Sequence, residues 1–200
     1  ELDRRKLDKE IEDLFVEYPV ELVADQLILP LLRGFNQDQY PQQAAFEFFY
    51  SLITEQIQRM IYRQRQSACG RKVLIVLSNP EEYQLYSLLL SYALLVNGFQ
   101  TETVASISPD NLVYVVNKLK IDFVVIIGFE KINQLRVNQY LQAITSQSQS
   151  LPVLLGNIAN YWNSLEQSSI GFSTYQELIK FMQKGSGDDY KTLDKAKSEL

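Results

Sequence analysis

A short segment rich in carboxylates and tyrosines follows an apolar run in the middle of the chain. Residues 78–86 read Ser-Asn-Pro-Glu-Glu-Tyr-Gln-Leu-Tyr and come directly after the run 72–77. Glu81, Glu82 and the more distant Glu130 have side chains that can support acid–base or metal-phosphate chemistry. Their spacing does not impose a shared site, so these residues alone do not predict a catalytic centre.

The absence of histidine from the chain excludes several classes of active site. Ser-His-Asp and Cys-His catalysis, histidine-type zinc sites and histidine ligation of haem or cobalt all need an imidazole. A Walker phosphate loop and the pattern Gly-x-Gly-x-x-Gly are also missing from the sequence. We therefore expect that the chain is not an enzyme and has neither a catalytic residue nor a metal site.

The first third of the chain has the periodicity of amphipathic helices. Apolar residues recur at helical spacing in the stretches 7–18, 19–33 and 41–64. In the middle stretch the expected buried stripe is Val20, Val23, Leu27, Leu31 and Leu32. Helices with apolar stripes and short connections favour a small antiparallel bundle, which we expect over residues 1–68.

Beyond residue 70 the periodicity changes to short apolar runs that are typical of β-strands. The runs are 72–77, 100–104, 122–127, 152–155 and, more weakly, 170–172. Helical patterns separate them, and this alternation indicates β-α-β units on a parallel sheet. We expect a flavodoxin-like α/β domain over residues 70–184, with a ligand cleft at the carboxyl ends of its strands.

Sequence signals also mark helix ends in this second region. The glycine of Asn97-Gly98 predicts a left-handed helix C-cap. Ser108 predicts the N-cap of a following helix, and Ser173 with Gln176 predicts a capping pair for the last one.

Composition and charge narrow the classes of partner. The net charge is -5 and the basic residues are not clustered, which argues against nucleic-acid binding by this fragment. No apolar run reaches the roughly 20 residues that cross a bilayer, so we expect no membrane partner. Cys69 is the only cysteine and can form no internal disulfide, which is typical of a protein of the reducing cytoplasm.

A helix bundle followed by an α/β domain, with the turn at 78–86, resembles the effector half of MerR-type transcription regulators that carry a cobalamin-binding domain. The resemblance covers about residues 7–183. The family pattern at this turn is Asp/Glu-x-His-x-x-Gly, and Glu81 aligns with its acidic position while Tyr83 and Tyr86 align with the His and the Gly. The resemblance implies that one tyrosine replaces the cobalt ligand and the other fills the passage of the nucleotide tail.

The other motifs of that family are present only in outline. Light-sensing members cover the upper face of cobalamin with a Trp and a Glu-His pair, for which this chain has Gln37, Glu47 and Phe48. Residues 128–130 replace a Ser-x-Leu motif, and residues 156–157 replace a Gly-Gly pair. The resemblance thus implies a regulatory module without a cofactor. Its candidate ligand- or partner-binding residues are Glu47, Phe48, Tyr83, Tyr86, Gly128, Phe129, Gly156 and Asn157.

Packing alone also accounts for these positions. Tyr83 and Tyr86 have the spacing of residues on the buried face of a helix. Gly128 and Gly156 fit tight strand-to-helix turns.

Residues 185–200 form a separate segment at the end of the sequence. They begin with Gly-Ser-Gly, the composition of a flexible spacer, and continue with a polar stretch in which Tyr190, Leu193 and Leu200 fall near one helical face. A natural disordered tail, an expression remnant and an engineered tethered peptide are alternatives. A tethered peptide would dock as a short helix through these anchors, between the bundle and the sheet or on the helix 41–64.

Two functions from different classes are consistent with these patterns. Phe46, Phe48, Phe49 and Tyr50 cannot all face one core, because consecutive helical residues point about 100° apart. Some must face the α/β domain, a second copy or another protein. We expect a cofactor-free regulatory module that binds a protein partner, such as a short amphipathic helix or its own copy in a homodimer. The alternative is a small-molecule sensor whose former cobalamin cleft takes a different ligand.

Overall fold

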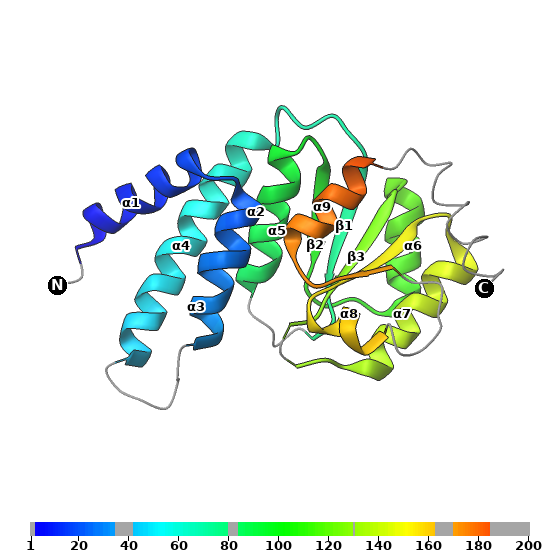
Figure 1. Cartoon of the computed structure of the whole chain (residues 1–200). Helices are drawn as coiled ribbons and strands as arrows, with labels where there is room; N and C mark the ends of the chain where they lie inside the picture. Colours follow the sequence, from blue (N-terminus) through cyan, green and yellow to red (C-terminus); the bar gives the residue numbers. More distant parts are fainter. Residues whose placement is uncertain (1–2, 35–41, 80–83, 130, 163–169, 185–200) are drawn as a thin grey trace.

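The computed structural model describes most of the chain, and its parts are arranged as in Figure 1. The described residues are 3–34, 42–79, 84–129, 131–162 and 170–184. Sequence-based interpretations that fall outside them concern Gln37, Glu81, Glu82, Tyr83, Glu130 and the tail anchors Tyr190, Leu193 and Leu200.

The N-terminal helices pack side by side next to the α/β part of the molecule (Figure 1). They are α1 (Arg4–Glu17), α2 (Val20–Val23), η1 (Ala24–Ile28), α3 (Leu29–Gly34) and α4 (Gln42–Gln64). Asp3 caps the N-terminus of α1, and its carboxylate accepts hydrogen bonds from the backbone N–H groups of Arg5 and Lys6. No helix within the described ranges combines the length and the apolar character needed to cross a membrane.

η1 is a π-helical turn inside an otherwise continuous helix. The N–H of Leu29 bonds to the carbonyl five residues before it, and Pro30, which follows, has no N–H to donate to the normal ladder. A π turn inserts one extra residue and rotates the positions around it. The expected buried stripe is therefore wrong at Leu27 and Leu31, which are 42% and 41% exposed, while Ile28 is buried instead.

The strands form one parallel sheet in the order β2-β1-β3-β4-β5. They are β1 (Lys72–Leu77), β2 (Gln100–Val104), β3 (Phe123–Ile127), β4 (Leu151–Leu155) and β5 (Ile170–Phe172). This order is that of the flavodoxin-like sheet. The expected fold class is confirmed, and the expected strand bounds differ from the observed ones by at most one residue.

Helices cover both faces of the sheet, because the side chains of the central strands are apolar on both sides. β1 sends Val73, Ile75 and Leu77 to one face and Leu74 and Val76 to the other. The first face lies under α5 (Gln84–Val96) and α9 (Tyr175–Lys184). The second lies under α6 (Pro109–Leu119), α7 (Gln134–Gln147) and α8 (Asn157–Trp162).

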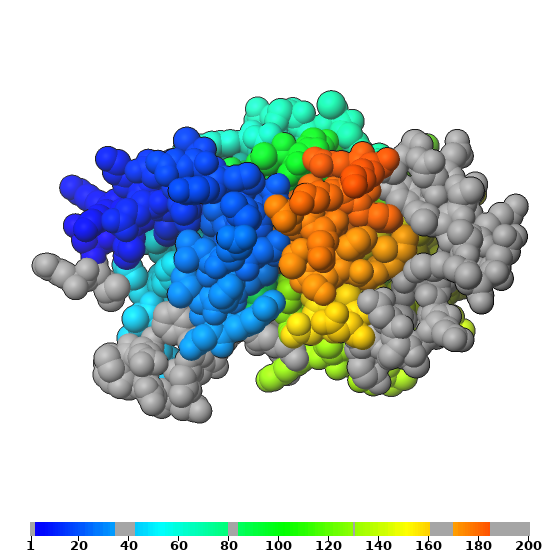
Figure 2. All heavy atoms as spheres, in the orientation of Figure 1, coloured from blue at the N-terminus to red at the C-terminus, as the bar shows by residue number. Residues whose placement is uncertain are grey.

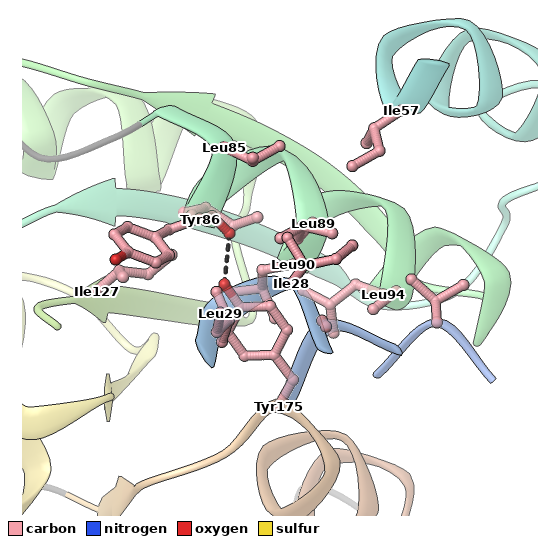
Figure 3. Packing of buried hydrophobic residues seen from close by; sticks show 14 of the residues in the cluster. Ile28, Leu29, Ile57, Leu85, Tyr86, Leu89, Leu90, Leu94, Ile127 and Tyr175 are labelled. Atoms are coloured by element: carbon pink, nitrogen blue, oxygen red, sulfur yellow. Dashed lines mark hydrogen bonds between the residues drawn. The ribbon is translucent and has the colours of Figure 1, made fainter. Parts of the chain in front are cut away.

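The first face of the sheet and the N-terminal helices share one hydrophobic core. Figure 3 shows Ile28 and Leu29 beside Leu90 and Leu94 of α5, and all four side chains are buried. Burial of one such side chain stabilises a fold by about 1.5–3 kcal/mol. The helices are therefore packed on the sheet layer through α5 and do not form a separate core.

The helix caps follow the sequence signals at two of three places. Gly98 has a φ of 87° after α5, and Ser108 accepts a hydrogen bond from the backbone N–H of Asn111 at 3.4 Å. The expected pair Ser173 and Gln176 is wrong by one position, because Thr174 caps α9 by accepting from the N–H of Glu177 at 3.2 Å. The N–H of Gln176 is instead bound by a residue of the N-terminal helices, described below.

Candidate functional site

The candidate site lies at the carboxyl edge of the sheet, where the connections after β1, β3 and β4 meet. The strand order reverses between β1 and β3, and doubly wound sheets bind ligands at such a switch point. Ser78 follows β1, Gly128 and Phe129 follow β3, and Gly156 and Asn157 follow β4. The fold therefore brings these motif positions together, although they are distant in sequence.

An aromatic cluster of Tyr86, Phe129 and Tyr175 fills the space beneath this edge. All three residues are at most 1% exposed. The rings of Tyr86 and Phe129 lie 4.9 Å apart at 33°, and those of Phe129 and Tyr175 lie 6.0 Å apart. The Tyr175 hydroxyl donates a 2.7 Å hydrogen bond to the Tyr86 carbonyl oxygen (Figure 3). The sequence-based packing interpretation of Tyr86 matches this placement.

The two glycines of the site are closely packed against their neighbours. A Cβ on Gly128 would lie 2.9 Å from Ser78 Oγ and 3.1 Å from Ile158 Cβ. Gly156 has a φ of 98°, and a Cβ there would lie 2.8 Å from the Gly128 carbonyl oxygen and 2.8 Å from the Phe129 ring. Glycine at these positions lets the strand ends and Phe129 approach one another closely.

Two side chains of the N-terminal helices reach the same edge of the sheet. The Arg33 guanidinium, at the end of α3, lies 5.0 Å from the centre of the Phe129 ring. The phenol of Tyr50 in α4 is hydrogen-bonded by the backbone N–H groups of Gln84 and Leu85, and its burial raises its pKa above 10.0. Tyr50 therefore occupies the N-terminus of α5, where partial positive charge would otherwise attract an anion.

Asp25 of η1 caps the N-terminus of α9, as Tyr50 caps that of α5. Its carboxylate accepts hydrogen bonds from the N–H groups of Tyr175 and Gln176, each at 3.0 Å. Figure 2 shows the blue N-terminal helices meeting the orange α9 at this side of the molecule. Burial raises the pKa of Asp25 above 3.8 in spite of these bonds, and the nearby carboxylates Glu177 and Glu21 raise it further.

The substitution Asp25→Asn is expected to change how stability depends on pH. Because the folded pKa of Asp25 is raised, its contribution is greatest below its ordinary value of 3.8 and is lost as pH rises through the folded value. The unfolding free energy of the wild type minus that of the variant should therefore be larger at about pH 3.5 than at about pH 7. Urea titrations at both pH values measure this difference, and a larger difference at neutral pH would contradict the assignment.

The remaining candidate residues have different environments. Phe48 is half-buried against the shared core, whereas Glu47 is exposed on α4. Asn157 is exposed and its side-chain amide donates to the Phe129 carbonyl oxygen.

Sequence reasoning missed Asp25, Arg33 and Tyr175 and did not assign Tyr50 a contact. For Asp25 a signal was available in the sequence. It is a carboxylate in the middle of an amphipathic helix, where its side chain has no hydrogen-bond donor within the same helix.

Two polar grooves lie at the same edge of the sheet. One, of about 480 Å³, lies between the connection after β2 and the start of α7, and Ser106, Asn133 and Arg136 line it. A second, of about 520 Å³, is lined by Asn79 and Lys131 among others. Across the described part of the chain, no group of three or more Cys, Asp or Glu side chains is placed to hold a metal ion.

Comparison with known proteins supports the fold assignment. No family model matches the chain, and no curated protein matches it in sequence. Among solved structures, the chain is similar to a novel cobalamin-binding protein from Desulfitobacterium hafniense DCB-2, with a TM-score of 0.51 and 11% identity. The similarity covers 94% of this chain and 100% of the other. The expected cobalamin-binding-like fold is therefore confirmed.

The described residues do not fit cobalamin at the positions that the family resemblance implies. The Tyr86 ring is buried where the resemblance places the nucleotide tail, and Phe129 lies directly against Gly156 at the turn that replaces the Gly-Gly pair. The Arg33 guanidinium also lies over the Phe129 ring.

Proposed function

We propose that the chain is a cofactor-free regulatory module of a cytoplasmic transcription regulator, which binds a segment of a partner protein or a second copy of itself. The observation that carries the proposal is the filled switch point, where Tyr86 packs on Phe129 at 4.9 Å with both residues buried. The N-terminal helices also close this edge through Arg33 and Tyr50. A site closed by the chain's own side chains favours a protein partner over a cofactor.

Exposed apolar side chains on the N-terminal helices support a protein partner. Leu27 and Leu31 are one helical turn apart and about equally exposed, and Phe48 of α4 is only half-buried. Short amphipathic helices bind to surfaces of this kind through spaced apolar anchors. We include in this proposal that the regulator is of the MerR type. The order of the two parts, a helix bundle followed by an α/β domain, supports this assignment.

The purified protein is expected to be colourless and to bind neither adenosylcobalamin nor haem. The missing histidine and the burial of Tyr86 both oppose binding. The measurement is an absorption spectrum after incubation with each cofactor and gel filtration. A corrin or Soret band that co-elutes with the protein in stoichiometric amount would overturn the cofactor-free proposal.

Phe48→Ala is expected to weaken association with a partner or a second copy more than it weakens the fold. Because Phe48 is half-buried, its loss should cost less than the about 3–5 kcal/mol of a fully buried phenylalanine. Phe46, which is 2% exposed on the same helix, is the matched control, and Phe46→Ala should cost that full amount. Thermal melts and sedimentation velocity over a concentration series measure both effects. If Phe48→Ala changed neither stability nor association, Phe48 would not belong to the proposed partner-binding surface.

A small-molecule sensor is the alternative, and the polar grooves at the carboxyl edge of the sheet favour it. Arg136 lines one of them, and its guanidinium also donates to Ser106 Oγ at 3.3 Å. Ser78 Oγ is buried and lacks a hydrogen-bond partner among the described residues. A rise in melting temperature with a small anion such as inorganic phosphate, lost in Arg136→Gln, would support the sensor.

A further inference from the structure

A larger groove lies at the opposite, amino-terminal edge of the sheet, away from the proposed site. Its volume is about 920 Å³, and it runs between the end of α6, the start of β3 and the connection from α7 to β4. Its lining includes Arg71, Lys120, Asp122, Phe123 and Leu151. The lining combines two cations with apolar side chains.

The last described helix ends beside this groove. Arg71 lines the groove, lies 5.0 Å from the centre of the Phe123 ring and donates a hydrogen bond to the carbonyl oxygen of Met182 in α9. One residue further on, the Gln183 amide donates to the Asn97 side chain at 2.6 Å. Figure 1 shows α9 ending at the edge where β1 begins. The chain after Lys184 therefore starts at this edge.

The length of the spacer limits where the following segment can go. Residue 188 lies four residues beyond Lys184, which is at most about 13–14 Å of extended chain. The carboxyl edge is a further strand length away, about 17 Å for five residues. Asp188 therefore cannot reach the cleft at the other edge of the sheet, whereas the groove shares Arg71 with the end of α9.

Charge in the groove is complementary to the start of that segment. Lys120, at the end of α6, takes part in none of the ion pairs among the described residues. The one carboxylate of the lining, Asp122, accepts a 2.7 Å hydrogen bond from the backbone N–H of Lys72. Two consecutive aspartates follow the spacer in the sequence, and the cations Arg71 and Lys120 line the groove.

We infer that residues 188–193 dock in this groove, with Asp188 and Asp189 near Arg71 and Lys120 and with Tyr190 on the apolar floor formed by Phe123 and Leu151. A short tether keeps the segment at an effective concentration in the mM range, so a weak site suffices. The inference does not rest on the proposed function, since it concerns the other edge of the sheet. It also differs from the docks expected from sequence, which lie between the bundle and the sheet or on the helix 41–64.

Hydrogen exchange of the intact chain tests this docking. Amides of residues 189–193 should exchange about tenfold more slowly in the wild type than in Lys120→Glu. Lys118→Glu, which changes the charge on the same helix outside the groove, is the matched control and should leave the rates unchanged. Adding Asp188→Lys and Asp189→Lys to Lys120→Glu should restore protection, because the charges are then reversed on both sides.

Several outcomes would overturn the inference. Exchange of residues 189–193 at the unprotected rate in the wild type would show that the segment is undocked. Equal effects of Lys118→Glu and Lys120→Glu would show only general electrostatics. Loss of protection in Tyr62→Ser but not in Lys120→Glu would place the segment on α4, where Tyr62 is 73% exposed. Protection of β3 and β4 amides in each variant verifies that it is folded.

Discussion

Tyr86→Ala is expected to lower the free energy of unfolding by about 3–5 kcal/mol, as for other fully buried aromatic residues. The side chain is inaccessible to solvent, stacks on Phe129 and lies in the core shared by the N-terminal helices and the sheet. Alanine would leave a cavity between α5 and Phe129 that neighbouring residues can fill only in part. Urea or guanidinium titration monitored by circular dichroism measures the loss.

A second tyrosine provides the control for this measurement. Tyr114 of α6 is 66% exposed, and Tyr114→Ala should change stability by no more than about 0.5 kcal/mol. If Tyr86→Ala were equally neutral, the aromatic cluster would not be a packed element of the fold.

Gly156→Ala should also be strongly destabilising, by about 2–5 kcal/mol. The backbone at this position is left-handed, with a φ of 98°, which an alanine adopts only with strain. The new Cβ would in addition lie 2.8 Å from the backbone oxygen of Gly128, and a backbone atom cannot move aside as a flexible side chain can. The two costs combine, and denaturant titration measures their sum.

Substitution of Gly98 measures the backbone strain without the steric contact. Gly98 is also left-handed, with a φ of 87°, but a Cβ there would have no atom within 4 Å. Gly98→Ala should therefore cost only the backbone strain of about 1–2 kcal/mol. Equal losses in Gly98→Ala and Gly156→Ala would contradict the close contact of Gly156 with Phe129 and Gly128.

The sheet could be predicted from sequence because its central strands are apolar on both faces. Runs such as 72–77 and 122–127 have no other stable place than the middle of a covered parallel sheet. The π turn could not be predicted in this way. Pro30 interrupts the helical hydrogen-bond ladder, and the spacing of apolar residues does not reveal this interruption. That one inserted residue moved Leu27 to the surface and Ile28 into the core.

Only those residues of the candidate site that lie at strand-to-helix connections could be predicted from the sequence. Gly128, Gly156 and Tyr86 stand directly at strand-to-helix connections, so topology alone brings them to one edge. Asp25 binds a helix end that is 150 residues away in sequence, and no local pattern specifies such a partner. The side chains that close the site thus come from the part of the chain where periodicity indicates only a bundle.

The caps supplied by Asp25 and Tyr50 have a consequence for how the molecule unfolds. If the N-terminal helices swung away, the first turns of both α5 and α9 would lose acceptors for their N–H groups, while Ile28 and Leu90 would become exposed. Opening would then cost several kcal/mol at once. Bundle and sheet should therefore behave as a single cooperative foldon, with their slowest amides exchanging only through global unfolding.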